Sequence, residues 1–142
     1  VAVSTTGTIG GCLRHIREHG YATQVVAVDA EGSVLFDGTR GPRILPGYGA
    51  GVVPDLSAAV HPDRVIRVAA PDAVRAARSM ARTTGFLPGA SGGAVAHALE
   101  MLLADGAQGD IVGIFHDDGR PYVDTVYNDD WVKEHLESGA GE

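Results

Sequence analysis

The residues best suited to chemistry are small and hydroxylic, and they gather in a loop between an apolar segment and an amphipathic one. Ser4-Thr5-Thr6-Gly7-Thr8 follows residues 1–3 and precedes residues 9–19. Small side chains let a bound group approach the backbone, and the free N–H groups and dipole of a helix N-terminus favour an anion. The same hydroxyls could instead cap the helix. The pattern therefore leaves two interpretations, a phosphate site and plain capping.

Two further loops of small residues add to this pattern. Gly89-Ala90-Ser91-Gly92-Gly93 precedes an apolar helix expected over 94–104, so Ser91 is either an N-cap or a hydroxyl that faces a crevice. Pro46-Gly47-Tyr48-Gly49-Ala50-Gly51 is too rich in glycine for a helix or strand, and it is either a flexible loop or part of a site. No loop matches the Walker motif or the dinucleotide-binding glycine motif. Three such loops at the ends of elements of one sheet predict a ligand crevice.

The elements that must position these loops alternate between strands and helices. Strands are expected at 1–3, 23–29, 64–68 and 111–115, and helices at 9–19, 71–84, 94–104 and 129–137. Short strand–helix–strand links predict parallel strands with helices packed against them. The expected fold class is therefore α/β, a three-layer αβα arrangement with a mostly parallel sheet. Residues 31–56 form a long loop whose apolar residues favour an ordered structure.

The bulk composition is that of a soluble globular domain. The 142 residues suffice for one core, and 44% of them are apolar and 20% charged. The apolar runs are too short to cross a membrane. A net charge of −7 without a basic cluster argues against a nucleic-acid partner. The single cysteine, Cys12, permits no internal disulfide and no cysteine-based zinc site, and we expect no metal and a cytoplasmic location.

In their order along the chain, the three loops resemble one family of enzymes. Three segments are similar to those of the cysteine synthase and cystathionine β-synthase family: Ser4-Thr5-Thr6-Gly7-Thr8-Ile9, Gly47-Tyr48-Gly49-Ala50-Gly51-Val52-Val53-Pro54 and Gly89-Ala90-Ser91-Gly92-Gly93-Ala94. The resemblance covers essentially the whole chain. It implies the fold type II (tryptophan synthase β-like) architecture of pyridoxal-phosphate enzymes, with residues 1–142 as a single C-terminal cofactor-binding domain.

The resemblance also implies a role for each loop. The phosphate of pyridoxal 5′-phosphate would be held by Ser4, Thr5, Thr6, Gly7 and Thr8, although Ser4 and Thr6 replace two glycines that the family usually has. Ser91 would lie against the pyridine nitrogen, where a neutral hydroxyl favours elimination of a β-substituent. Gly47, Tyr48 and Gly49 would line the substrate pocket. His116 stands where the family commonly has proline, and we expect a surface histidine there.

A narrower resemblance concerns the reaction. Residues 122–131 and the Ser-Thr-Thr-Gly-Thr loop are similar to a subgroup that makes 2,3-diaminopropionate precursors for siderophores and peptide antibiotics. That similarity implies a β-replacement that joins O-phosphoserine to L-glutamate and gives N-(1-amino-1-carboxyethyl)glutamate. Two alternatives stay open: a cysteine synthase that uses sulfide with O-acetylserine or O-phosphoserine, and a non-catalytic binding module with the same fold.

The family uses a lysine that is not found at the expected site. Pyridoxal-phosphate enzymes form a Schiff base through a lysine, and in this family it precedes the phosphate loop. The only lysine here is Lys133, which we expect at the surface of the last helix. The chain is therefore expected to be a C-terminal fragment that has no catalytic residue and is inactive and poorly soluble alone. The full-length protein is expected to act on small amino-acid substrates as a homodimer.

Overall fold

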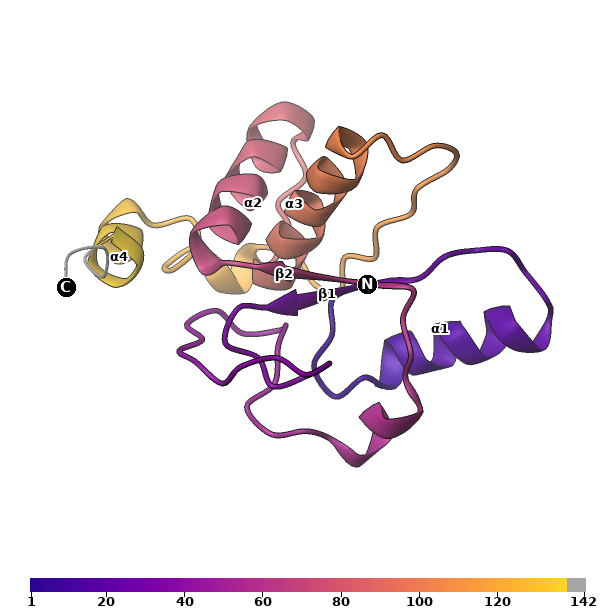
Figure 1. Ribbon diagram of the computed structural model, residues 1–142. Helices are drawn as coiled ribbons and strands as arrows, with labels where there is room; N and C mark the ends of the chain where they lie inside the picture. Colours follow the sequence, from indigo (N-terminus) through magenta and orange to yellow (C-terminus); the bar gives the residue numbers. More distant parts are fainter. Residues whose placement is uncertain (138–142) are drawn as a thin grey trace.

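The centre of the molecule is a short parallel sheet. A computed structural model of the chain describes residues 1–137 (Figure 1). Strands β1 (Val26–Ala30) and β2 (Arg64–Val68) pair in parallel, and Ala2 forms a parallel bridge to Val28 at the other edge of β1. The strand expected at 64–68 is confirmed, whereas the one expected at 23–29 spans only Val26–Ala30.

Helices lie on both sides of the strands (Figure 1). α1 (Gly7–Glu18) lies on one side, and α2 (Ala70–Thr84) and α3 (Ala90–Ala104) lie together on the other. The expected α/β class with parallel strands is therefore confirmed. None of the helices within the described part of the chain is long and apolar enough to cross a membrane.

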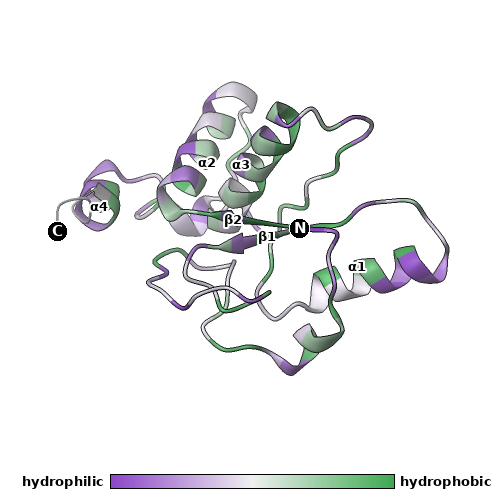
Figure 2. Cartoon of the chain, viewed as in Figure 1, coloured by the Kyte–Doolittle hydropathy of each residue, from purple (hydrophilic) through white to green (hydrophobic). Residues whose placement is uncertain are grey.

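β1 divides its side chains between two cores. Val28 and Ala30 pack with residues of β2, α2 and α3. Ala27 points the other way and packs with Val3 and Ile9 on the side of α1. Successive side chains of a strand point to opposite faces, so one strand serves both layers. Full burial of an aliphatic side chain such as that of Ile9 stabilises the fold by about 1.5–3 kcal/mol. Figure 2 shows hydrophobic residues at the centre of the molecule, where the two strands lie.

The start of α2 agrees with the range expected from the sequence, whereas that of α3 does not. α2 has Pro71 in its first turn and ends at Gly85, whose φ of 75° is left-handed, so the expected helix 71–84 is confirmed. α3 begins at Ala90 instead of residue 94. The glycines at 92 and 93 are poor helix formers, but they allow a close approach to neighbouring segments: a Cβ on Gly93 would lie 2.2 Å from the Ala73 carbonyl oxygen.

The remaining helical segments are short. They are the 3-10 turns η1 (Asp55–Ala59) and η2 (Arg120–Tyr122), one α-helical turn α4 (Asp129–Val132), and the π-helical η3 (Lys133–Glu137). Asn128 Oδ1 caps α4 by accepting the Trp131 N–H at 3.0 Å. The expected helix 129–137 thus changes from α-helical to π-helical after Val132.

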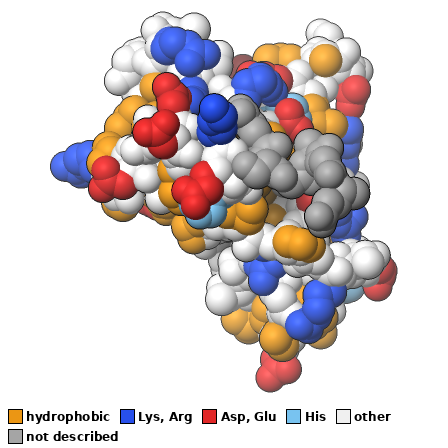
Figure 3. Space-filling model, turned by 90° about the vertical axis from the view of Figure 1, so that its left-hand side faces the viewer, with side chains coloured by type: hydrophobic (Ala, Val, Ile, Leu, Met, Phe, Trp, Pro, Cys, Tyr) orange, Lys and Arg blue, Asp and Glu red, His pale blue; other side chains and the backbone are white. Residues whose placement is uncertain are grey.

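The face shown in Figure 3 mixes acidic and basic side chains.

The strand expected at 111–115 is wrong. This segment has no strand hydrogen bonding, and within residues 1–137 no backbone–backbone hydrogen bond involves residues 110–116. An open cleft of about 600 Å³ lies between Ile111–Ile114 and apolar residues that include Val1, Val28 and Leu99. A strand forms only beside a paired neighbour, and residues 1–3 present too short an edge for pairing across this cleft.

Candidate cofactor site

The Ser4–Thr8 loop leaves the N-terminus of α1 uncapped. Thr6 is the N-cap residue, with φ 66°, and no side chain accepts a hydrogen bond from the first turn. The plain-capping interpretation is therefore wrong. The backbone N–H groups of Gly7, Thr8 and Ile9 have no partner among the described residues, and no acidic side chain lies in the first turn. Free N–H groups and an uncompensated dipole make this end of the helix suited to an anion.

Thr6 carries two features that are costly without a ligand. A left-handed φ is uncommon for a residue with a branched side chain, and such strain concentrates at functional sites. Its side chain is 3% exposed, and Oγ1 has no hydrogen-bond partner within the part of the chain that the structure describes. A buried, unpaired hydroxyl costs about 1–3 kcal/mol. A bound polar group that accepts or donates a hydrogen bond here would remove that cost.

A small cleft brings the predicted loops together. It measures about 150 Å³ and is lined by Ala2, Val3, residues 4–9, Gly47 and His116. Gly47 has φ 88°, and a Cβ on it would lie 3.2 Å from Ser91 Cβ and 3.3 Å from Ser91 Oγ. The backbone at Gly47 therefore lies directly against Ser91. His116, for which only a surface position was expected, also lines this cleft.

Ser91 sits in the first turn of α3 rather than before it. The N-cap residue is Gly89, so the N-cap interpretation of Ser91 is wrong. The residue is 2% exposed. A polar group in this position is available to a ligand atom in the adjacent cleft.

Tyr48 and Gly49 lie beside the cleft without lining it. Tyr48 is 3% exposed and packs in the core with β1 and β2, and burial, with a smaller effect of Glu31 and Asp72, raises the pKa of its phenol. Gly49 N–H donates to the Val3 carbonyl at 2.6 Å, and a Cβ there would lie 2.6 Å from Ala30 Cβ. These two residues therefore anchor the segment that presents Gly47.

Two tyrosines that the residue pattern alone did not single out hold the turn before Ser91. Tyr127 Oη donates to the Pro88 carbonyl at 2.5 Å, and Tyr122 Oη donates to Asp117 Oδ2 at 2.6 Å. Burial and, after it, the hydrogen bond to Asp117 raise the pKa of Tyr122 to about 12. The first contact joins residues 39 positions apart, and the second lies within an irregular segment. No local sequence signal predicts either of them.

The residues present fit a phosphorylated cofactor. The uncapped helix suits a phosphate, the buried Thr6 hydroxyl lacks a partner among the described residues, and Ser91 brings a neutral hydroxyl against Gly47, which lines the cleft. Lys133, the only lysine in the sequence, belongs to η3 near the C-terminal end of the chain. It does not line this cleft. Within the described residues, no group of three or more His, Cys, Asp or Glu could hold a metal ion.

The fold and the cleft define the class: an α/β protein with an uncapped helix N-terminus at a cleft. The family model for pyridoxal-phosphate dependent enzymes matches residues 1–118. The N-(2-amino-2-carboxyethyl)-L-glutamate synthase of Ralstonia nicotianae is 42% identical over 142 residues, covering 99% of this chain and 42% of the relative. The synthase of the same name from Cupriavidus metallidurans is 39% identical over 136 residues, covering 93% of this chain and 40% of the relative. The chain belongs to the pyridoxal-phosphate dependent enzyme family.

Solved structures agree with this placement. The O-acetylserine dependent cystathionine beta-synthase of Helicobacter pylori matches with a TM-score of 0.76 and 25% identity, over 87% of this chain and 41% of that one. O-acetylserine sulfhydrylase isoform 3 of Entamoeba histolytica matches with a TM-score of 0.75 and 31% identity, over 89% and 39%. The expected resemblance to part of a fold type II enzyme is confirmed. The chain spans about two fifths of the length of these relatives.

Proposed function

We propose that residues 1–142 are the C-terminal, cofactor-holding domain of an enzyme that replaces the β-substituent of an activated serine with the amino group of L-glutamate. The observation that carries this proposal is the 42% identity to a named N-(2-amino-2-carboxyethyl)-L-glutamate synthase along 99% of the chain. O-phosphoserine is the proposed activated serine, and the product would serve 2,3-diaminopropionate supply for a siderophore or an antibiotic. The whole protein would act in the cytoplasm as a homodimer.

The residues of the cleft have distinct proposed roles toward pyridoxal 5′-phosphate. The N–H groups of Gly7, Thr8 and Ile9, with the hydroxyls of residues 4–8, would hold its phosphate. Ser91 would hydrogen-bond the pyridine nitrogen, and a neutral hydroxyl does not keep that nitrogen charged as a carboxylate would. Bound there, the cofactor supplies an electron sink for carbanion chemistry at the amino-acid substrate. The bare backbone at Gly47 leaves room for that substrate beside it.

The structure of the product follows from the reaction class. Replacement at the β-carbon of serine joins the glutamate nitrogen to that carbon, which gives N-(2-amino-2-carboxyethyl)-L-glutamate. This is the compound in the names of the two relatives. The position numbers in the product expected from the sequence, N-(1-amino-1-carboxyethyl)glutamate, are corrected accordingly. The class of reaction is unchanged.

A cysteine synthase is the second candidate. It is favoured by the 31% identity and the TM-score of 0.75 to an O-acetylserine sulfhydrylase. The two candidates share the cofactor and the activated serine and differ in the nucleophile, sulfide instead of an amine. A test must therefore vary the nucleophile while the rest of the reaction is held constant.

The deciding experiment uses the full-length protein with pyridoxal phosphate. Its visible absorbance is recorded before and after O-phosphoserine, and L-glutamate or sulfide is then added and the product identified by mass spectrometry. We expect a cofactor band that shifts with O-phosphoserine and a glutamate adduct as product. Cysteine as the faster product would favour the second candidate. A protein that binds no cofactor at all would contradict both and leave a binding module with the same fold.

A further inference from the structure

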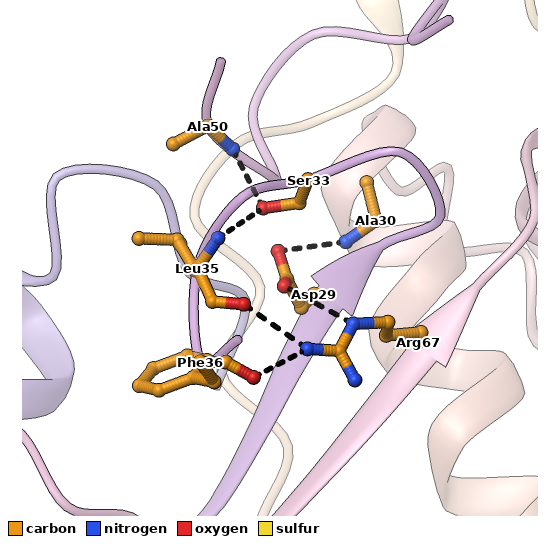
Figure 4. A network of polar contacts seen from close by, with 7 residues as sticks. All are labelled: Asp29, Ala30, Ser33, Leu35, Phe36, Ala50 and Arg67. Atoms are coloured by element: carbon orange, nitrogen blue, oxygen red, sulfur yellow. Dashed lines mark hydrogen bonds and ion pairs between the residues drawn. The ribbon is translucent and has the colours of Figure 1, made fainter. Parts of the chain in front are cut away.

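A polar network at the end of β1 ties together the two arms of the loop that carries Gly47 (Figure 4). Ser33 Oγ accepts hydrogen bonds from the Leu35 N–H at 3.3 Å and from the Ala50 N–H at 3.0 Å. Ser33 is fully buried, and 17 residues separate it from Ala50. One hydroxyl therefore closes a long loop whose second arm contains the Gly47-Tyr48-Gly49 segment.

Asp29 completes this network from the sheet. Its side chain is fully buried, and Oδ1 accepts the Ala30 N–H at 2.9 Å. A serine hydroxyl has two acceptor positions and one donor, and the two N–H groups fill the acceptor positions of Ser33. Its proton is not used by these two bonds, and the buried Asp29 Oδ2 has no hydrogen-bond partner among residues 1–137. In agreement, burial raises the pKa of Asp29, and the Ser33 hydroxyl acts most strongly against that effect.

Arg67 of β2 fixes the first arm of the loop. Its Nη2 donates to the carbonyl oxygens of Leu35 at 3.0 Å and Phe36 at 2.8 Å, and its Nε lies 3.8 Å from Asp29 Oδ2. Phe36 and Asp37 have φ values of 50° and 60°, in the left-handed region. Such a bend persists only where the surrounding contacts hold it. Arg67 supplies two of those contacts.

The second arm leads directly to the cleft. Ala50 also accepts the Val34 N–H at 2.9 Å, and the adjacent Gly49 is bonded to Val3, the residue before the Ser4–Thr8 loop. Gly47, two residues further back, lies against Ser91 and lines the cleft. A displacement of Ala50 would therefore move Gly47 relative to Ser91.

We propose that Ser33, with Asp29 as its acceptor, is a positioning residue for the amino-acid substrate, because it sets the place of Gly47 at the floor of the cleft. Neither residue lines the cleft, so neither is catalytic. The identity of the substrate rests on the proposed function, whereas the control of the loop by Ser33 does not.

The test compares Ser33→Ala with Ser57→Ala in the full-length protein loaded with pyridoxal phosphate. Ser57 is a matched control, because its hydroxyl also bonds loop backbone, here by donating to the Pro54 carbonyl at 2.6 Å, away from the Gly47 segment. We expect Ser33→Ala to raise the KM for O-phosphoserine roughly 10- to 100-fold, with unchanged cofactor content and visible spectrum. Ser57→Ala should change KM by less than about twofold. Asp29→Asn, which keeps an acceptor oxygen, should stay much closer to wild type than Asp29→Ala.

Hydrogen exchange gives a readout that needs no turnover. Ser33→Ala should speed exchange in the peptide 44–51 and leave that of 116–122 unchanged. If the wild type shows no turnover but Ser33→Ala still gives this local change, the proposed function is contradicted and the positioning role is not. An active wild type with an unaltered KM in Ser33→Ala, or unaltered exchange at 44–51, overturns the positioning role. Loss of cofactor with faster exchange throughout also overturns it, because Ser33 would then only support the fold.

Discussion

Gly47 joins two loops of the candidate cofactor site because only a residue without a side chain fits its position. Its φ of 88° is left-handed, which an L side chain adopts at a cost of about 1–2 kcal/mol. Its backbone also lies so close to Ser91 that an added Cβ would stand 3.2 Å from the serine Cβ. The first property concerns stability in general, whereas the second concerns the site. Gly85, with φ 75° and open space around it, has the first property alone.

Gly47→Ala and Gly85→Ala should therefore separate strain from contact. Both should lower the free energy of unfolding by about 1–2 kcal/mol, because both place a Cβ in the left-handed region. Only Gly47→Ala should weaken cofactor binding, since only it pushes on Ser91. Urea unfolding and titration of the full-length apoprotein with pyridoxal phosphate measure the two effects. Equal cofactor affinities for the two variants would show that the Gly47–Ser91 approach does not shape the site.

Asp29 and Asp63 are two aspartates whose environments shift the carboxyl pKa in opposite directions. Burial is the largest effect on Asp29 and raises its pKa. The folded protein thus holds that proton more tightly than the unfolded chain, and stability falls as pH rises from the ordinary pKa through the folded one. For Asp63, the hydrogen bond from the Val25 N–H and then Arg17 lower the pKa. Its contribution is present above the ordinary pKa and is lost as pH falls through the folded one.

The two asparagine variants should consequently show opposite pH dependences. Relative to wild type, Asp29→Asn should gain stability as the pH is raised above about 4, where a free aspartate ionises. Asp63→Asn should lose stability relative to wild type in a lower window, as the pH rises from the lowered pKa of the folded state up to about 4. Urea unfolding of each variant at a series of pH values measures the difference. Slopes of the same sign for both variants would contradict the account of burial at Asp29.

Among the elements, α3 shows how packing overrides local propensity. Gly92 and Gly93 place the expected start of the helix at residue 94, because glycine costs about 1 kcal/mol in a helix interior. The structure starts the helix at Ala90. A Cβ on Gly93 would lie 2.2 Å from the Ala73 carbonyl oxygen and 2.9 Å from Ala77 Cβ, so the glycine permits the close contact of α3 with α2. That contact also places Ser91 in the first turn.

Gly93→Ala should therefore destabilise the protein although alanine is the better helix former. Overpacking of this kind costs about 1–3 kcal/mol. Gly11→Ala in α1 is the matched control, because nothing lies within 4 Å of its added Cβ. That variant should gain about 0.5–1 kcal/mol from propensity. Thermal or urea unfolding measures both, and a neutral or stabilising Gly93→Ala would show that the two helices can separate at little cost.

The success of prediction from sequence depended on whether the deciding contacts were local. β2 coincides with its expected range, because its apolar residues meet both β1 and α2. The segment 111–115 has an equally apolar pattern but lacks a partner strand. Ser4–Thr8, Gly47 and Ser91 were singled out by their small size, and the structure brings them together. The bond from Ala50 to Ser33 was not foreseen, since 17 residues separate its partners and neither type is distinctive.

At the scale of the whole molecule, the main irregularity is an unpaired sheet edge. Residues 1–3 bond β1 on one side only, and the apolar segment 111–115 faces them across the cleft of about 600 Å³. Val112 on that segment is 81% exposed. Exposed backbone groups beside β-branched side chains invite pairing with another chain. The isolated 142-residue chain should therefore self-associate through this edge, in line with the poor solubility expected of it.

Val112→Lys should reduce this self-association, because a charge on the apolar segment that faces the unpaired edge opposes pairing with another chain. Val52→Lys is the matched control: Val52 has the same side chain and is 74% exposed, but it lies in the loop before η1, away from the edge. Light scattering of the isolated chain against concentration compares them. If simple loss of exposed apolar surface were the cause, both variants would help equally. A gain confined to Val112→Lys attributes the association to the unpaired edge itself, since the added charge is the same in both.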